Sequence, residues 1–255
     1  MRTTNPLLTA SGFCDSSYLT DEAKMTLGGT IRRAILLFLG VVAATAITWN
    51  IGSEHPYRGH VKWVGLASLA IGFILSIITC SRSHWSIFTA PIFSIVEGIV
   101  LGVGCLNMES IYPGIVVQAV ALTFATCLAC FVAYGCGIAH IVPGVWRNVG
   151  IGIWGLTFLY LPLFVLNSMH VPAPFKVTYS WLSFAACLAG LILATTNLIV
   201  DFDFIERKVQ TGAPRYMEWY AGFALIAALV WLYADIILLL AKIRDSSARP
   251  SDSES

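Results

Sequence analysis

The sequence predicts an all-α integral membrane protein with seven transmembrane helices. Of its 255 residues, 57% are hydrophobic and 11% are charged, and the mean hydropathy is +0.78. A soluble domain carries about 25% charged residues, and an aqueous core of this length cannot bury so large an apolar excess. The charged residues also collect between long apolar runs. The solvent that fits such a chain is a lipid bilayer.

Seven apolar runs are long enough to cross a bilayer, because a helical span needs about 20 residues. The runs are residues 33–52, 61–80, 86–106, 113–135, 148–168, 180–201 and 217–243. Tryptophans mark many of their boundaries, as is typical of membrane interfaces. They are Trp49, Trp63, Trp85, Trp146, Trp181 and Trp219. The chain therefore divides into a polar N-terminal segment (residues 1–30), a seven-helix membrane domain (31–243) and a disordered polar tail (244–255).

The sixth and third runs carry signals about helix length and packing. Asp201 closes the sixth apolar run, but the stop signal Gly212-Ala213-Pro214 comes later, so we expect the helix to continue through Val209. Small residues on the third run permit close packing against a neighbouring helix. They are Gly98, Gly102 and Gly104.

The distribution of lysine and arginine predicts that the N-terminus is cytoplasmic. With seven spans, nine basic residues fall on the N-terminal side of the membrane and six on the other side. The side that is richer in them faces the cytoplasm, which places the C-terminus outside. The basic residues at the end of the seventh run and just after it, Lys242 and Arg244, favour the alternative that this segment is re-entrant and that both termini are cytoplasmic.

Several classes of function find no support in the sequence. The net charge is +1, which indicates no nucleic-acid partner. The chain has neither an HExxH zinc motif nor a GxSxG nucleophile motif, and its histidines are scattered over the connections, so we expect no enzyme and no tightly bound cofactor. Most of the seven cysteines fall within apolar runs, which favours buried free thiols. Metal or redox chemistry at Cys127 and Cys130 is the less favoured alternative.

The residues that indicate chemistry are acids in or near the apolar runs. They are Glu97 in the third run, Asp201 and Asp203 at the end of the sixth, and Asp235 within the seventh. An aspartate at mid-bilayer costs roughly 2.5–3.5 kcal/mol on insertion scales, and residues that costly usually face a cavity, a partner or an ion path. For Glu97 and Asp235 the alternative is a protonated carboxyl group bonded to a neighbouring helix. For Asp203 it is a solvated helix end.

A pair of acids has properties that a single acid lacks. If Asp201 and Asp235 meet, they cannot both ionise cheaply, so they share a proton and titrate as a unit. The protonated pair is then a hydrogen-bonded latch between helices six and seven, and the deprotonated pair attracts a cation. Two carboxylates with waters make a weak calcium site, because calcium takes about 6–8 oxygen ligands.

Several separate motifs resemble the Bax-inhibitor-motif membrane family. They are Ala90-Pro91-Ile92-Phe93 with Glu97-Gly98, then Tyr112-Pro113-Gly114-Ile115-Val116-Val117-Gln118-Ala119, and Leu232-Tyr233-Ala234-Asp235-Ile236-Ile237. Two others resemble the bacterial YccA-type branch of that family. They are Met25-Thr26-Leu27-Gly28-Gly29-Thr30 and Asp201-Phe202-Asp203-Phe204-Ile205. The resemblance covers about residues 20–243.

The resemblance implies a seven-helix fold with the last helix central, and a pH-sensitive calcium leak. Asp201 and Asp235 match the two aspartates that form the pH-sensing latch in such relatives, and Asp203 is an additional acid. A basic residue near the start of span three can pair with the acid of helix six, and Arg82 is the candidate for it. Calcium would be the permeating ion, and protons would control the gate.

One departure from the calcium-leak relatives keeps a second function open. The connection between Asp201 and Asp235 is longer here, and the YccA-type branch is also linked to the restraint of a membrane-bound protease. The main expectation remains a pH-sensitive calcium leak in a bacterial inner (plasma) membrane. The alternative is a non-transporting regulator that binds and restrains a membrane protease or a stress or cell-death complex. Residues 1–30 would then be the segment that binds the partner.

Overall fold

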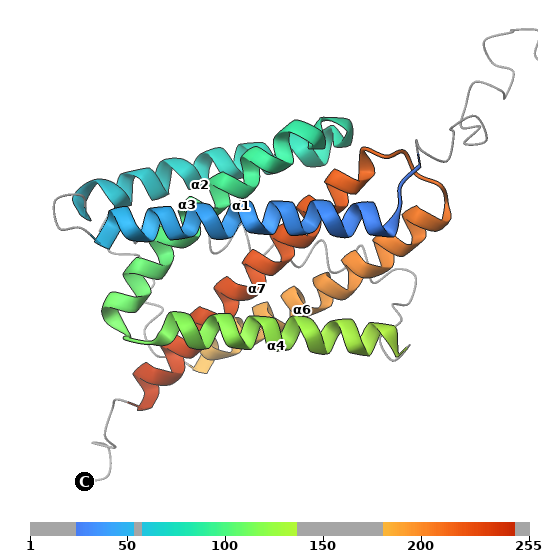
Figure 1. Ribbon diagram of the computed structural model, residues 1–255. Coiled ribbons are helices and arrows are strands. Elements are labelled where there is room, and N and C mark those ends of the chain that lie inside the picture. The colour runs from blue at the N-terminus through green and yellow to red at the C-terminus, as the bar shows by residue number, and fades with distance from the viewer. Residues whose placement is uncertain (1–23, 54–57, 137–180, 248–255) are drawn as a thin grey trace, which may run out of the picture.

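The computed structural model describes residues 24–53, 58–136 and 181–247. These residues form α-helices, and no β-strand occurs among them (Figure 1). The elements are α1 (Leu27–Ser53), α2 (Arg58–Ser81), the 3-10 helix η4 (Ser83–Trp85), α3 (Ser86–Ile111), α4 (Ile115–Gly135), α6 (Trp181–Gln210) and α7 (Met217–Ser247).

The predicted class of an all-α, multi-pass membrane protein is confirmed for the part of the chain that the structure describes. Six of its helices are long and apolar enough to cross a membrane. They correspond to six of the seven predicted runs, in the predicted order. The remaining run, residues 148–168, lies outside the described residues.

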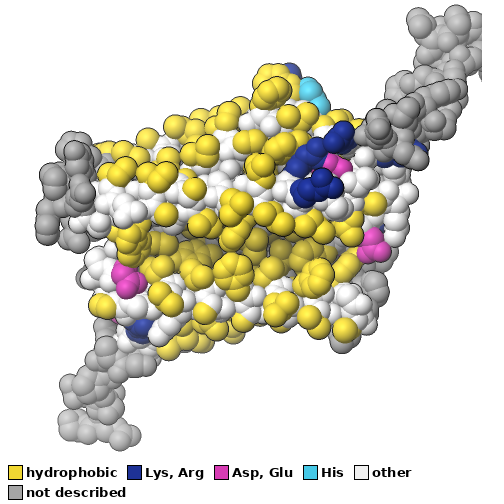
Figure 2. Space-filling view, viewed as in Figure 1, with side chains coloured by type: hydrophobic (Ala, Val, Ile, Leu, Met, Phe, Trp, Pro, Cys, Tyr) yellow, Lys and Arg dark blue, Asp and Glu magenta, His cyan; other side chains and the backbone are white. Residues whose placement is uncertain are grey.

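The outer surface of the bundle is apolar, as contact with lipid requires. Many large hydrophobic side chains are exposed, among them Phe88 at 75% and Val117 at 72% of their full accessible area. Figure 2 shows hydrophobic side chains over the middle of one face and charged side chains towards its two ends. In water such a surface would favour aggregation, whereas in a bilayer it is the expected exterior.

The last helix lies among the other described helices, because α7 contacts α1, α3, α4 and α6 (Figure 1). On one side Leu232 packs in a cluster with Ile115 of α4 and Leu198 of α6. On the other side the ring of Phe223 lies 4.7 Å from that of Phe93 on α3, edge to face. α7 therefore joins an α1–α3 half of the bundle to an α4–α6 half.

Helix six passes Asp201, as the position of the stop signal predicted. α6 continues for nine further residues, to Gln210. It ends because Gly212 adopts a φ of +67°, a left-handed conformation that favours glycine. The N–H of Ala213 then donates to the carbonyl of Lys208 at 3.0 Å, and the chain reverses into α7. The two helices form an antiparallel hairpin, which sets the level at which their acids lie.

The glycines of α3 permit a close approach to α1, as predicted for two of the three. A Cβ atom on Gly98 would lie 2.5 Å from the carbonyl oxygen of Val41, and one on Gly102 would lie 2.7 Å from Cβ of Thr48. Gly104 has nothing within 4 Å of the same position. Gly98 and Gly102 therefore serve helix packing, whereas Gly104 packs against no residue in the described part of the bundle.

The start of the membrane domain differs from the predicted boundary at residue 30. α1 begins at Leu27, because Thr26 caps it. The hydroxyl oxygen of Thr26 accepts a hydrogen bond from the N–H of Gly29 at 3.0 Å, which satisfies one of the free donors of the first turn.

The end of the domain also differs, because α7 continues to Ser247 and takes in residues 244–247 of the predicted disordered tail. Two side chains of this last turn bind the α3–α4 turn and the start of α4. Arg244 donates to the carbonyl of Pro113 and to Oε1 of Gln118, each at 2.8 Å. The hydroxyl of Tyr112 donates to Asp245. These contacts fix the helix end beyond the apolar run.

Candidate functional site

The acid of α7 lies against a glycine of α6. Asp235 is half-buried, and a Cβ atom on Gly190 would lie only 3.0 Å from its Oδ1. No hydrogen bond or ion pair links Asp235 to another side chain in the described part of the chain. Gly190 thus gives this carboxyl group a place on the helix surface without neutralising its charge.

The acid of α6 lies elsewhere along the same helix. Asp201 is half-buried, and its Oδ2 accepts a hydrogen bond of 3.3 Å from the side-chain amide of Asn197. Asp201 follows Gly190, the neighbour of Asp235, by eleven residues. At a rise of 1.5 Å per residue that is about 16 Å along the helix axis.

The predicted proton-sharing pair is therefore corrected. A shared proton requires contact at about 2.5–2.7 Å, whereas Asp201 and Asp235 lie at levels about 16 Å apart along α6. They also cannot bind one calcium ion together, because its ligands lie at about 2.3–2.6 Å. The physical reason is the register of the α6–α7 hairpin, which brings Gly190 to Asp235 and places Asp201 three turns nearer to the connection.

The two acids nevertheless lie along one face of α6. Ala194, Asn197 and Asp201 follow Gly190 by four, seven and eleven residues, and such spacings lie on one side of a helix. Ala194 packs in the same cluster as Ala228 and Leu232 of α7, so this face points toward α7. We call these four α6 residues the α6 stripe. Its residues are small or polar, whereas most other residues between α6 and α7 are aliphatic.

Glu97 lies on a different interface. It is half-buried on α3, and a Cβ atom on Gly72 of α2 would lie 3.4 Å from its Oε2. No hydrogen bond joins Glu97 to another described residue. It therefore faces α2, and it is not part of the α6 stripe.

Asp203 belongs to a polar group at the end of α6. Its side chain is buried and makes an ion pair of 2.9 Å with Nε of Arg207, one turn later. The hydroxyl of Tyr134, at the end of α4, donates to Glu206. Asp203 is therefore a buried acid in an ion pair and not part of a solvated helix end, although the Arg207 side chain is 56% exposed.

Arg82 does not contact an acid of α6. It is exposed at the junction of α2 and η4, and its guanidinium lies 5.6 Å from the centre of the Trp85 ring. No ion pair to Arg82 occurs among the residues described. The expected pairing with the acid of helix six is therefore absent from this arrangement.

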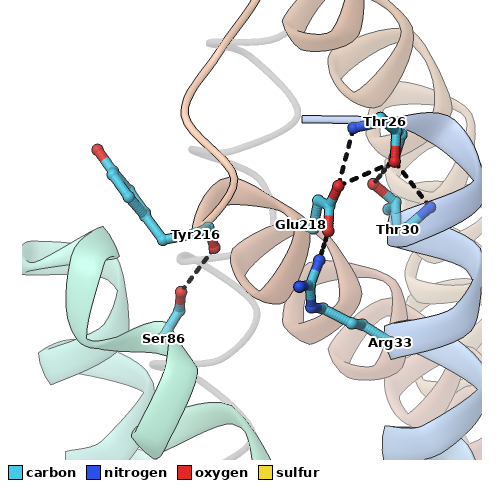
Figure 3. A network of polar contacts seen from close by, with 7 residues as sticks. Thr26, Thr30, Arg33, Ser86, Tyr216 and Glu218 are labelled. Atoms are coloured by element: carbon cyan, nitrogen blue, oxygen red, sulfur yellow. Dashed lines mark hydrogen bonds and ion pairs between the residues drawn. The ribbon is translucent and has the colours of Figure 1, made fainter. Parts of the chain in front are cut away.

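A buried acid that the sequence interpretation missed lies at the start of α7. Glu218 is 2% exposed. Its Oε1 accepts hydrogen bonds from the backbone N–H of Thr26 at 2.9 Å and from the Thr26 hydroxyl at 3.0 Å. Its Oε2 makes an ion pair with Arg33 of α1. Figure 3 shows the Glu218 side chain pointing between Thr26 and Arg33. We call Thr26, Gly29, Arg33 and Glu218 the α1–α7 clasp.

The clasp replaces a local helix-capping arrangement by a long-range one. In a capping box, an acid at the third helical position accepts from the N–H of the capping residue. That position of α1 is Gly29, and Glu218 takes the role from 192 residues away. A Cβ atom on Gly29 would collide with the Glu218 carboxyl group. The signal in the sequence was an acid in the first turn of the last helix, which is favourable there in any protein and so does not by itself indicate a partner.

Neither the clasp nor the α6 stripe forms an evident metal centre. Among the described residues there is no group of three or more histidine, cysteine, aspartate or glutamate side chains that could hold a metal ion. A cation at Asp235 or Asp201 would therefore depend on one carboxylate, backbone or amide oxygens, and water. Such a set of ligands would hold a cation weakly, as suits an ion that passes through and not one that is stored.

A comparison with protein-family models places this sequence in a known group. A family model described as Bax inhibitor 1 like matches residues 5–245. The chain belongs to the Bax inhibitor 1 like family. The match includes the α6 stripe, Asp235 and the whole α1–α7 clasp, and it agrees with the resemblance noted in the sequence. It is to the family as a whole and does not select the YccA-type branch.

Other comparisons add no closer relative. No curated protein and no solved structure gives a significant match to the chain. Membership of the Bax inhibitor 1 like family and six apolar helices identify a multi-pass membrane protein.

Proposed function

We propose that this member of the Bax inhibitor 1 like family is a pH-sensitive leak for cations, chiefly calcium. The observation that carries the proposal is the placing of Asp235 on Gly190, at one end of the α6 stripe, with Asp201 at the other end. Carboxyl groups inside apolar helices without a basic partner are costly. An ion path explains why they lie here.

The α6 stripe supplies the groups that a weak cation path needs. Gly190 and Ala194 leave room beside α7, and Asn197 offers an amide between the levels of the two acids. An ionised carboxylate attracts a divalent cation, and a protonated one does not. Since the acids are about 16 Å apart along the axis, we propose that each titrates as a separate site and that the gate is not a shared proton.

The remaining features of the proposal follow from the sequence. We propose that the chain is not an enzyme and has no tightly bound cofactor. Its N-terminus would be cytoplasmic, in a bacterial inner membrane, and its cellular role would be a response to stress. Among the residues described, the end that carries the start of α1 and the α6–α7 connection holds more lysine and arginine than the opposite end, in support of that orientation.

The test is calcium flux into liposomes that contain the purified protein and a calcium dye. Asn cannot ionise, so Asp235→Asn and Asp201→Asn should each change the dependence of influx on pH. Separate sites also predict that the effects on flux, expressed as free energies, add in the double variant, because sites more than about 7–10 Å apart are usually independent. A proton-sharing pair predicts strong non-additivity.

The matched control is Glu206→Gln, which removes an acid from the exposed end of α6. It should leave influx and its pH dependence unchanged. Wild-type liposomes without calcium influx would contradict the leak itself. Influx with the wild-type pH dependence in both aspartate variants would leave the leak standing and remove the role of the two acids.

A second candidate function is a regulator that binds and restrains a membrane protease or a stress or cell-death complex without transport. The observation that favours it is the attachment of the residues before α1. Met25 is buried, and its N–H donates to the carbonyl of Ala213 at 2.7 Å, in the α6–α7 connection. A partner that held the N-terminal segment would therefore act directly on this helix pair.

Deletion of residues 1–20 separates the two functions, because it removes most of the proposed partner-binding segment (residues 1–30) and leaves Met25 in place. Retained calcium influx with lost protease restraint would assign restraint to the N-terminal segment. Lost influx with retained partner binding would reverse the assignment. The protease readout is the rate of cleavage of a membrane substrate when the protease and this protein are reconstituted together.

A further inference from the structure

We propose that the end of the bundle at the start of α1 binds an anionic phospholipid, whose phosphate contacts Arg32 and Arg215. The proposal does not rest on the proposed leak. It follows from the charge balance around the clasp and from the apolar surface directly below it.

Positive charge exceeds negative charge around the clasp. Arg32 and Arg215 lie close enough to Arg33 to repel its guanidinium. Glu218 is the acid that neutralises Arg33, so two guanidinium groups are left over. Both Arg32 and Arg215 are exposed, and neither makes an ion pair with a described acid. The positive charges of Arg32 and Arg215, beside an already neutralised Arg33, favour an anion at this end of the bundle.

An apolar stripe on α1 begins next to Arg32 and runs along the helix into the membrane. Ile35, Leu36 and Leu39 follow Arg32 by three, four and seven residues, so all four share one helix face. The three apolar side chains are 53%, 54% and 60% exposed. Figure 2 shows Lys and Arg side chains gathered at the end where α1 begins, next to hydrophobic surface. A ligand that fits both parts has an anionic head and a hydrocarbon tail.

This combination favours a phospholipid over free phosphate. Guanidinium groups bind phosphate oxygens in a bidentate way, and that chemistry is common to both ligands. The acyl chains of a lipid would also cover the exposed Ile35, Leu36 and Leu39 face, which free phosphate leaves bare. A zwitterionic lipid would offer the same chains, but its own cationic group would oppose the two arginines.

The probe is dioleoyl phosphatidylglycerol, titrated into the purified full-length chain in detergent micelles, with bound lipid counted by native mass spectrometry. The wild type should bind it more tightly than dioleoyl phosphatidylcholine. Arg32→Gln and Arg215→Gln should each weaken binding of the anionic lipid about fivefold, the usual contribution of one basic residue at such a surface. Binding of the zwitterionic lipid should not change.

The matched control is Arg207→Gln. It removes the same charge at the same end of the bundle, but from a guanidinium that Asp203 already neutralises, so lipid binding should stay within about twofold of the wild type. An equal loss in Arg207→Gln would overturn the proposed site in favour of the general charge of that end. Displacement of the lipid by millimolar inorganic phosphate would overturn the lipid in favour of a phosphate site. Equal affinity for both lipids would overturn the role of the arginines.

Discussion

The carboxyl group of Glu218 occupies the space that the missing side chain of Gly29 leaves at the third position of α1. The contact joins two ends of the sequence, since Glu218 opens the last helix and Gly29 lies in the first turn of the first. Ser86, at the start of α3, adds a hydrogen bond of 3.2 Å to the carbonyl of Tyr216 beside it (Figure 3). One end of α7 is thus fixed to both α1 and α3.

Gly29→Ala should destabilise the protein, although alanine is intrinsically the better helix former by about 1 kcal/mol. Its Cβ atom would collide with the Glu218 carboxyl group, so the clasp would have to open. The matched control is Gly28→Ala, because that position has nothing within 4 Å. Gly28→Ala should be neutral or raise the midpoint of thermal unfolding in micelles, and Gly29→Ala should lower it. Equal midpoints for the two variants would contradict the contact.

Glu218→Gln should lower stability by about 3 kcal/mol or more, because removal of one partner from a buried ion pair leaves the other charge uncompensated. Thermal unfolding in micelles measures the effect. Glu206→Gln is the control on an exposed glutamate and should change stability by less than about 0.5 kcal/mol.

A double-mutant cycle assigns the Glu218 effect to the ion pair. If Arg33 is the partner, Arg33→Gln together with Glu218→Gln should cost clearly less than the sum of the two single changes, since no buried charge is then left alone. Additive costs would mean that the two side chains stabilise the bundle independently.

The membrane helices could be predicted because the bilayer dictates their length. An apolar run of about 20 residues has few alternatives to a span, and the described helices follow the predicted runs closely. The clasp could not be predicted in the same way. Hydropathy is a property of one segment, and it does not say that Glu218 meets Thr26 across 192 residues of sequence.

Gly98→Ala should destabilise the bundle by about 1–3 kcal/mol, the usual cost of overpacking. Its Cβ atom would meet the backbone carbonyl of Val41, which cannot rotate away as a side chain does. Gly104→Ala on the same helix has open space and should be neutral or stabilising. Thermal unfolding in micelles compares the two. A loss of equal size in both variants would contradict the α1–α3 contact as the cause, because helix propensity favours alanine at both positions.

The error about the aspartate pair has a physical cause that the sequence already contained. In an antiparallel hairpin, facing residues lie at similar distances from the turn. Asp201 precedes Gly212 by 11 residues, whereas Asp235 follows Pro214 by 21. The two acids therefore cannot face each other unless a helix is interrupted, and both helices are continuous here.

Disulfide cross-linking tests that register directly. In a background without the native cysteines, Gly190→Cys with Asp235→Cys should form a disulfide on mild oxidation, because Gly190 lies against the Asp235 side chain. Asp201→Cys with Asp235→Cys should not, since a disulfide needs Cα atoms within about 7 Å and these levels are about 16 Å apart along α6. Peptide mass spectrometry identifies the products. An efficient cross-link between positions 201 and 235 would refute the hairpin register and return the gate to a shared proton.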